Sequence, residues 1–343
     1  MSPNSSLMSK EIAEIPQAAQ RFLQETSEAV RRCAEDMRAR DPGLVATVAR
    51  GSSDHAATYL KYAFELAGEI PVASIGPSIA SIYRRQLRLN GSVCVGISQS
   101  GRSPDIVELM RSANVGGALT VAITNDPASP LARSTAHPLA LRSGPERSVA
   151  ATKTFVASVL AGLALLAEWQ EDEALRAAVT SAPDVFSDAL ACDWSLLSDR
   201  LARANSAFVL GRGPSFAIAN EIALKFKETS GIHAESYSAA EVLHGPAALV
   251  EAGFPVLVLA VEDEALEQVR GTASRLAGQG ADVFMTASGG ADITELPAAK
   301  GLHPLLAPVA LVVSFYVMVE SLARRRGFEP DVPPHLRKVT ETL

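Results

Sequence analysis

The feature that most constrains the fold of this chain is a series of short apolar runs separated by longer stretches with helical periodicity. Strands that are apolar at nearly every position are typical of parallel sheets with helices on both faces. In the first half of the chain these runs are 44–49, 93–97 and 119–124. The stretches predicted as helices are 54–67, 77–87, 104–115 and 151–169. Alternation of such strands and helices predicts a doubly wound α/β domain.

The same scheme restarts in the second half, after helices predicted over about 175–203. Apolar runs follow at 207–210, 256–261 and 283–286. Arg50-Gly51-Ser52-Ser53 follows the first strand, and Arg212-Gly213-Pro214-Ser215 follows the corresponding strand 162 residues later. Each run leads into a helix that ends near a glycine. We therefore expect two copies of one α/β unit, and the length of 343 residues is sufficient for two domains.

Charge and cysteine usage exclude several classes of protein. The net charge of −7 argues against a nucleic-acid partner. Cys33, Cys94 and Cys192 are odd in number and far apart, so we expect reduced thiols in a cytoplasmic protein and no zinc site. The apolar runs 155–167 and 305–319 are shorter than the roughly 20 residues of a membrane span. We predict buried core helices there, and no membrane partner, metal or organic cofactor.

A loop rich in hydroxyl side chains follows the run 93–97. Its sequence is Ser98-Gln99-Ser100-Gly101-Arg102-Ser103-Pro104, which places Ser103 at a helix N-cap and Pro104 in the first turn. Short hydroxyl side chains and free N–H groups at a helix N-terminus form an anion cradle, most often for phosphate. The loop lacks both GK[ST] and GxGxxG, which disfavours a nucleotide; an ordinary serine-rich turn is the alternative. Ser53 follows another strand and is predicted to contact the same ligand.

A second motif combines charged residues with a histidine. Glu221, Lys225 and Glu228 are spaced so that they share one face of a helix. A solvated charged stripe is the ordinary interpretation of that spacing. Farther along, His244 precedes Gly245-Pro246, which predicts an imidazole on a turn within reach of a ligand.

Taken together, these motifs resemble those of the sugar-isomerase (SIS) domain family, in particular the isomerase half of glucosamine-6-phosphate synthases and its stand-alone relatives. Three further motifs complete the resemblance: Met8-Ser-Lys10-Glu11-Ile12…Pro16, Ser148-Val149-Ala150-Ala151-Thr152-Lys153 and Leu336-Arg337-Lys338-Val339-Thr340. The resemblance implies two tandem doubly wound domains, each a mostly parallel sheet flanked by helices in three layers. The expected segments are an N-terminal helical segment 1–35, a phosphosugar-binding domain 36–172, a helical linker 173–200, a second domain 201–328, and a tail 329–343 over the active site.

The resemblance also implies roles for individual residues. Glu228 would be the base that moves a proton between C1 and C2, and Lys338 would meet the open-chain carbonyl. His244, reaching across from the partner subunit of a homodimer, would assist ring opening. The implied phosphate contacts are Ser53, Ser98, Gln99, Ser100 and Ser103. The implied sugar-binding residues are Gly51, Ser52, Val149, Ala150, Glu221 and Lys225.

Departures from the synthase pattern affect the expected reaction. Arg50 stands where the synthase has a small neutral residue or cysteine, and Arg337 replaces a small residue beside Lys338. Position 2 is serine and the similarity begins near residue 8, so we expect no glutamine hydrolysis. The predicted reaction converts glucosamine 6-phosphate and water to fructose 6-phosphate and ammonia. The alternatives are a fructosamine-6-phosphate deglycase, a galactosamine-6-phosphate deaminase/isomerase and, from another class, a non-catalytic sugar-phosphate sensor.

Overall fold

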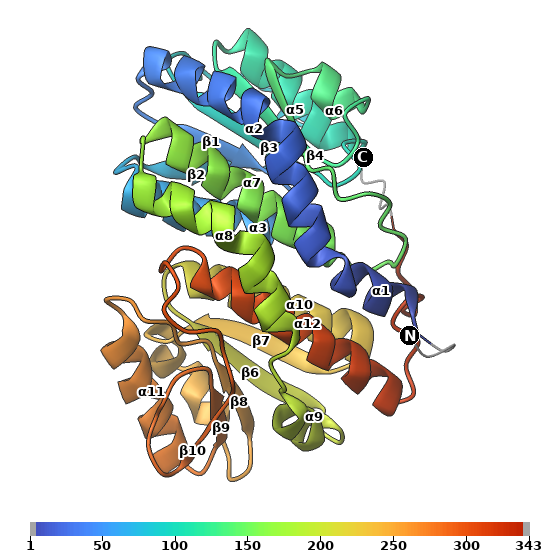
Figure 1. Cartoon of the computed structure of the whole chain (residues 1–343), viewed down its shortest axis with the longest axis vertical. Helices are drawn as coiled ribbons and strands as arrows, with labels where there is room; N and C mark the ends of the chain where they lie inside the picture. Colours follow the sequence, from blue (N-terminus) through green and yellow to red (C-terminus); the bar gives the residue numbers. More distant parts are fainter. Residues whose placement is uncertain (1–4, 339–343) are drawn as a thin grey trace. The chain divides into compact units, whose positions relative to one another are not determined.

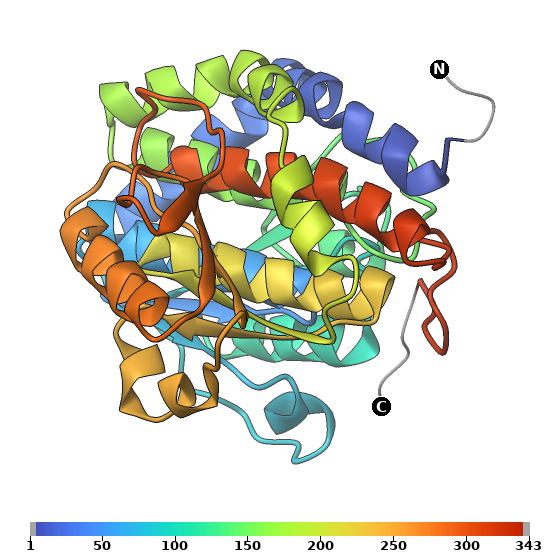
Figure 2. The ribbon, with the colours of Figure 1, turned by 90° about the horizontal axis from the view of Figure 1, so that it is seen from below.

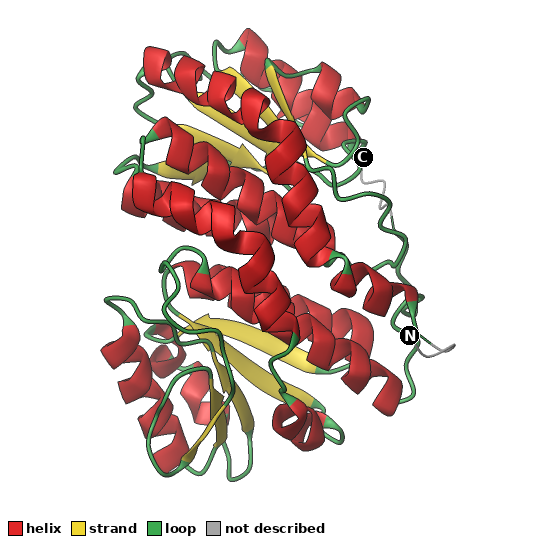
Figure 3. Cartoon of the chain, viewed as in Figure 1, coloured by secondary structure: helices red, strands yellow, loops and turns green. Residues whose placement is uncertain are grey.

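The computed structural model describes residues 5–338, which form two compact units. The β1–β5 unit comprises 14–146, 153–183 and the tail residues 337 and 338. The β6–β10 unit comprises 5–13, 147–152 and 184–336. Each unit contains one sheet flanked by helices (Figures 1 and 3). Both units are therefore assembled from segments that are far apart in the sequence.

The β1–β5 unit has a five-stranded sheet in the order β2-β1-β3-β4-β5, and every pairing is parallel. Its strands are β1 Val45–Val48, β2 Val72–Ser74, β3 Val93–Ile97, β4 Leu119–Thr124 and β5 His137–Ala140. Its helices are α2 Ile15–Arg40, α3 Ser52–Ala67, α4 Ser78–Ser81, α5 Pro104–Val115, α6 Pro130–Arg133, α7 Lys153–Trp169 and the first part of α8 Glu173–Leu190. Helices α2 and α3 pack on α7, whereas α4 and α6 pack on α5, so helices cover both faces of the sheet (Figure 1).

The β6–β10 unit repeats this topology. Its sheet order, β7-β6-β8-β9-β10, is the order of the first sheet with the strands renumbered, and it is again wholly parallel. Its strands are β6 Ser206–Gly211, β7 His233–Ser238, β8 Pro255–Val258, β9 Asp282–Met285 and β10 Ile293–Glu295. Its helices are α1 Leu7–Ala13, α9 Ser195–Leu201, α10 Pro214–Ser230, α11 Leu266–Gly278, α12 Ala307–Arg325 and the 3-10 turns η1 Glu241–His244 and η2 Pro246–Leu249. The predicted pair of doubly wound α/β domains is confirmed.

The repeat extends to backbone detail at matching positions. Gly51 precedes α3 with φ 55° and ψ −133°, and Gly213 precedes α10 with φ 56° and ψ −132°. This region of conformational space strongly favours glycine, because a Cβ atom would be strained there. Helices α5 and α11 likewise begin 162 residues apart, at Pro104 and Leu266. The two short sequence matches therefore mark the same strand–turn–helix in two copies of one unit.

One predicted helix is much shorter than expected, and three strands of the structure were not predicted. The helix expected over 77–87 is limited to Ser78–Ser81, and the chain then turns, with Arg84 at φ 50°. Ile82 and Tyr83, which a buried helix face would have covered, are exposed. Strands β2, β7 and β10 were not predicted, and all three lie at sheet edges. Edge strands are short or carry polar residues, so they lack the continuous apolar run that identifies a central strand.

The two long apolar runs form core helices, as predicted. All but one of the residues of α7 are buried. Helix α12 is long and apolar enough to cross a membrane, but most of it is buried, and it lies beside α10 of the same unit (Figure 2). That burial is typical of the core helix of a soluble domain. All three cysteines are free, and burial raises the pKa of Cys33 and of Cys94 to about 12.

Candidate active site

The hydroxyl-rich loop lies where β3 ends and α5 begins. Ser103 is the N-cap residue of α5 and Pro104 lies in its first turn, as predicted. The Ser103 side chain makes no capping hydrogen bond, so its hydroxyl is not engaged by its own helix. Gly101 has φ 62°, and a Cβ atom there would lie 2.2 Å from Ser129 Oγ. Only glycine fits this turn, so the conformation of the loop depends on it.

Ser52 and Ser53 are the first two residues of α3, which follows the neighbouring strand β1. Strands β1 and β3 are neighbours, with Val48 paired to Gly96, so their carboxyl ends meet at one edge of the sheet. The strand order reverses between β1 and β3, and such a switch point is where ligands bind in open α/β sheets. The structure thus places the predicted phosphate contacts near the starts of the two helices that follow these adjacent strands; the contacts are Ser53, Ser98, Gln99, Ser100 and Ser103.

Arg50, the unusual cation noted in the sequence, is not free. Its Nε and Nη2 donate to Asp105 Oδ2 at 3.0 and 2.6 Å. The Asp105 side chain is 2% exposed, and it lies in the first turn of α5, next to the predicted phosphate loop. A buried carboxylate at this position would repel a bound phosphate, and the guanidinium of Arg50 neutralises it.

The corresponding loop of the second copy is acidic and is not rich in hydroxyl groups. It lies between β8 and α11, 162 residues after the hydroxyl-rich loop, and contains Glu262, Asp263 and Glu264 at the positions of Ser100, Gly101 and Arg102. Burial raises the pKa of Asp263. Carboxylates would repel a phosphate dianion. Between the two copies of the loop, the first is the one suited to an anion.

The charged residues of α10 form a buried cluster, so the interpretation as a solvated stripe is wrong. Lys225 Nζ lies 3.3 Å from Glu221 Oε1 and also pairs with Glu228. The side chains of Glu221 and Lys225 are completely buried, and Tyr316 of α12 donates a hydrogen bond to Glu221 at 3.1 Å. Burial alone would lower the pKa of Lys225, but the two carboxylates hold it above its usual value. Glu228 keeps 20% of its side chain exposed, so this carboxylate remains accessible.

His244 is the last residue of the turn η1 and precedes Gly245, which has φ 144°. The imidazole is exposed on a turn, as the sequence predicted. Its contribution across a dimer interface stays a prediction.

The segment 147–152, which includes the predicted sugar-binding residues Val149 and Ala150, belongs to the β6–β10 unit and has no regular secondary structure. Buried Glu11 of α1 accepts hydrogen bonds from the backbone N–H groups of Arg147 and Ser148 and from the Ser148 hydroxyl. These contacts with Glu11 were not anticipated from the sequence.

Lys338 lies in the β1–β5 unit and is paired. Its Nζ lies 3.0 Å from Oε2 of Glu146, whose side chain is completely buried. Glu146 also accepts from Thr154 N at 3.1 Å and Thr154 Oγ1 at 2.6 Å. Sequence reasoning missed Glu146, although it stands two residues before the motif that starts at Ser148. Val339 and Thr340, the end of the tail motif, lie outside the described residues.

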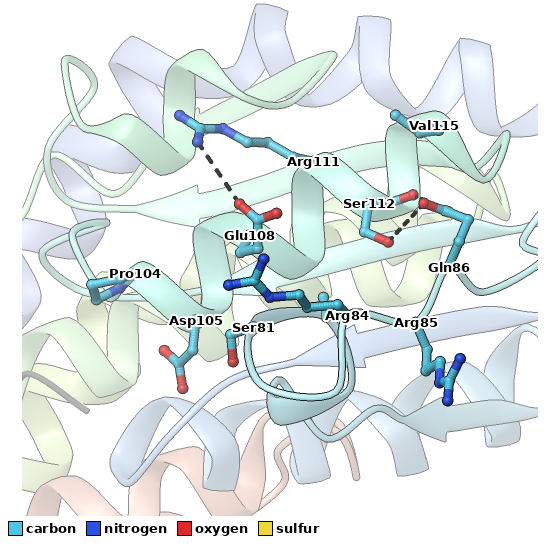
Figure 4. A pocket seen from close by; sticks show the side chains of 11 residues that line it. Ser81, Arg84, Arg85, Gln86, Pro104, Asp105, Glu108, Arg111, Ser112 and Val115 are labelled. Carbon is cyan, nitrogen blue, oxygen red and sulfur yellow. Dashed lines mark hydrogen bonds and ion pairs between the residues drawn. The ribbon is translucent and has the colours of Figure 1, made fainter. Parts of the chain in front are cut away.

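A hollow of about 680 Å³ lies between α5 and the segment 80–86, within the β1–β5 unit (Figure 4). It starts at Pro104 and Asp105, next to the hydroxyl-rich loop. Arg84 and Arg85 line it and have no side-chain partner among residues 5–338, and in Figure 4 their side chains point in different directions. Within the same described range, no group of three histidine, cysteine or acidic side chains is arranged to hold a metal ion.

Comparison with known proteins places this geometry in a family. The SIS domain model matches residues 40–168 and 200–323. A glutamine–fructose-6-phosphate aminotransferase (isomerizing) of Sulfurisphaera tokodaii is 31% identical over 96% of this chain and 56% of its own length. The chain therefore spans about half the length of the curated relatives it matches.

Solved structures of similar proteins have the same fold as this chain. A candidate phosphosugar isomerase from Silicibacter pomeroyi superposes with a TM-score of 0.92 and 52% identity, covering 95% of this chain and 100% of the other. The C-terminal domain of glucosamine-fructose-6-phosphate aminotransferase from Francisella tularensis gives a TM-score of 0.84 at 25% identity, covering 96% of this chain and 99% of that domain. Two matched SIS segments, each with its own parallel sheet, show that the chain belongs to the SIS domain family.

Proposed function

We propose that this chain is an amino-sugar-phosphate isomerase that releases ammonia, converting glucosamine 6-phosphate and water to fructose 6-phosphate. The observation that carries the proposal is the accessible carboxylate of Glu228, paired with the completely buried ammonium of Lys225. A carboxylate paired with a fixed cation is held in one orientation, as a general base requires. The similarity to isomerising aminotransferases, whose name includes fructose 6-phosphate, supports the substrate class.

The proposed reaction balances with water as the only second reactant. After the ring opens, Glu228 removes the proton from C2 of the open-chain aldose, the carbonyl oxygen O1 takes up a proton, and an enolamine forms. The carboxyl group of Glu228 then gives its proton to C1, which leaves a protonated imine at C2. Water adds to that imine carbon and the C2–N bond breaks, which gives fructose 6-phosphate and ammonia. One carboxylate serves both proton transfers because C1 and C2 are adjacent.

Other residues are proposed to support these steps. Ser53, Ser98, Gln99, Ser100 and Ser103 bind the phosphate through their side chains and through backbone N–H groups near the starts of α3 and α5. His244, contributed by the partner subunit of a homodimer, assists ring opening, because an imidazole gains and loses protons near neutral pH. Lys338 meets the open-chain carbonyl once it leaves Glu146, and Glu146 holds its ammonium before then. A cytoplasmic location is part of the same proposal.

The direct test is ammonia release from glucosamine 6-phosphate, compared with galactosamine 6-phosphate and a fructosamine 6-phosphate. We expect turnover to be fastest with glucosamine 6-phosphate, because the predicted reaction moves a proton between C1 and C2 of that sugar. Faster release from either of the other substrates would assign the chain to the corresponding alternative. Tight binding of glucosamine 6-phosphate with no product from any substrate would favour the non-catalytic sensor.

Substitution of Arg50 tests the phosphate site. Arg50→Ala leaves the buried Asp105 carboxylate uncompensated beside the loop, so KM for glucosamine 6-phosphate and Ki for inorganic phosphate should both rise by about tenfold. The charge explanation also predicts that adding Asp105→Asn recovers part of the lost affinity. Arg111→Ala is the control, because Arg111 lies on the same helix and its nearest carboxylate oxygen, on Glu108, is 3.9 Å away. Unchanged phosphate affinity in Arg50→Ala would contradict the proposed place of the phosphate.

A further inference from the structure

We infer that helix α1 positions the predicted sugar-binding segment 148–150, and that Glu11 is the positioning residue through which it does so. The inference rests on the proposed function, in which Val149 and Ala150 lie against the sugar. It assigns a role to the motif Met8-Ser-Lys10-Glu11-Ile12, which the proposed chemistry leaves unused.

The contacts of Glu11 all hold one short stretch of chain. Glu11 is 5% exposed, and its carboxylate oxygens accept hydrogen bonds from Arg147 and Ser148. Ser148 N donates to Oε2 at 3.3 Å, and Arg147 N and the Ser148 hydroxyl donate as well. Three hydrogen bonds to one buried carboxylate set both the backbone and the side chain of Ser148.

Helix α1 is held in turn by the C-terminal part of the same unit. The carboxylate of Asp331 accepts hydrogen bonds from Leu7 N and Met8 N, each at 2.7 Å, in the first turn of α1. The backbone carbonyl of Asp331 accepts from Val149 N at 3.4 Å. Helix α1 and Asp331 thus contact the segment on consecutive residues, Ser148 and Val149.

These contacts matter because the segment 147–152 has no helix or strand to organise it. Buried backbone N–H groups need acceptors, and here Glu11 and Asp331 supply them. Met8 and Ile12, one turn apart on α1, are buried and anchor the helix. Met8 and Ile12 therefore hold α1 in place, and the carboxylate of Glu11 holds the segment 147–152 in place.

The test is Glu11→Gln. Glutamine has nearly the same shape, but it loses the charge and presents an NH₂ group to donors. We expect KM for glucosamine 6-phosphate, and Kd for fructose 6-phosphate measured by calorimetry, to rise by about tenfold. Ki for inorganic phosphate should stay within about twofold, because the hydroxyl-rich loop belongs to the other unit and the hydrogen bonds of Glu11 described above go to residues 147 and 148. Glu28→Gln is the matched control, since Glu28 is an exposed carboxylate of α2 that pairs with surface arginines.

Ser148→Ala provides a second variant that keeps the backbone contacts to Glu11. It should reproduce part of the effect, and the double variant should be no worse than Glu11→Gln alone, because both changes remove the same contact. A purely structural role of Glu11 would lower the melting temperature and the active fraction with the two affinities unchanged, and that result would overturn the inference. Equal weakening of phosphate and sugar phosphate would overturn it too. Absence of ammonia release by the wild type would instead reject the proposed reaction, and the two binding measurements would still decide the role of Glu11.

Discussion

Replacing Glu228 with glutamine is expected to lower kcat for ammonia release from glucosamine 6-phosphate by about a thousandfold, with KM changed by less than about threefold. The amide nearly matches the carboxylate in shape but cannot take up the C2 proton. The loss should therefore fall on the chemical step and leave substrate binding nearly intact. Glu228 is suited to this role because Lys225 holds it in place and part of its side chain is exposed.

Proton exchange would identify the step that is lost. When the wild-type enzyme works in D₂O, deuterium should enter the sugar at C1 or C2, and NMR spectroscopy would detect it. Glu228→Gln should abolish this exchange together with turnover. Glu251→Gln, a change to an exposed carboxylate in the same unit, should alter neither. If Glu228→Gln lost turnover but kept the exchange, Glu228 would act in hydrolysis of the imine and another residue would be the base.

Replacing Lys225 with methionine is expected to lower the free energy of unfolding by about 3–5 kcal/mol, the largest effect on stability that we predict. Methionine fills much of the same space, but Glu221 is left completely buried without its counter-charge. The hydrogen bond from Tyr316 replaces only part of the lost interaction. Chemical denaturation of both proteins measures the difference. Lys227→Met is the control, because Lys227 is exposed on the same helix and should change stability by less than about 0.5 kcal/mol.

The sign of the pH dependence distinguishes this explanation from a simple packing defect. In Lys225→Met the uncompensated carboxylates bind a proton more readily in the folded chain than in the unfolded chain. Its stability should therefore fall, relative to the wild type, as the pH rises from 5 to 8. A loss of stability that is the same at both pH values would mean that packing, and not charge, causes the effect.

Prediction of secondary structure from the sequence succeeded where burial on both faces leaves a periodic signal. Strands β3 and β4 have the predicted bounds, and the repeat of Gly51 at Gly213 correctly indicated two copies of one unit. It failed for the edge strands β2, β7 and β10 and over 77–87, where a strand or turn is set by its neighbours and not by its own apolar pattern. The acidic loop 262–264 was visible in the sequence, but it became meaningful only once the structure aligned it with the hydroxyl-rich loop.

The sequence by itself determined the α/β class, the duplication and the positions of the residues that carry the proposed chemistry, because these depend on local periodicity and on ordered motifs. Only the tertiary structure decided which charges are paired and buried. The spacing of Glu221, Lys225 and Glu228 is the same on a solvated helix as on one covered by α12. Likewise, Glu11 forms a hydrogen bond with Ser148, 137 positions away in the chain, and Glu146 forms one with Lys338, 192 positions away. No local pattern encodes such contacts, because they form only when distant segments pack together.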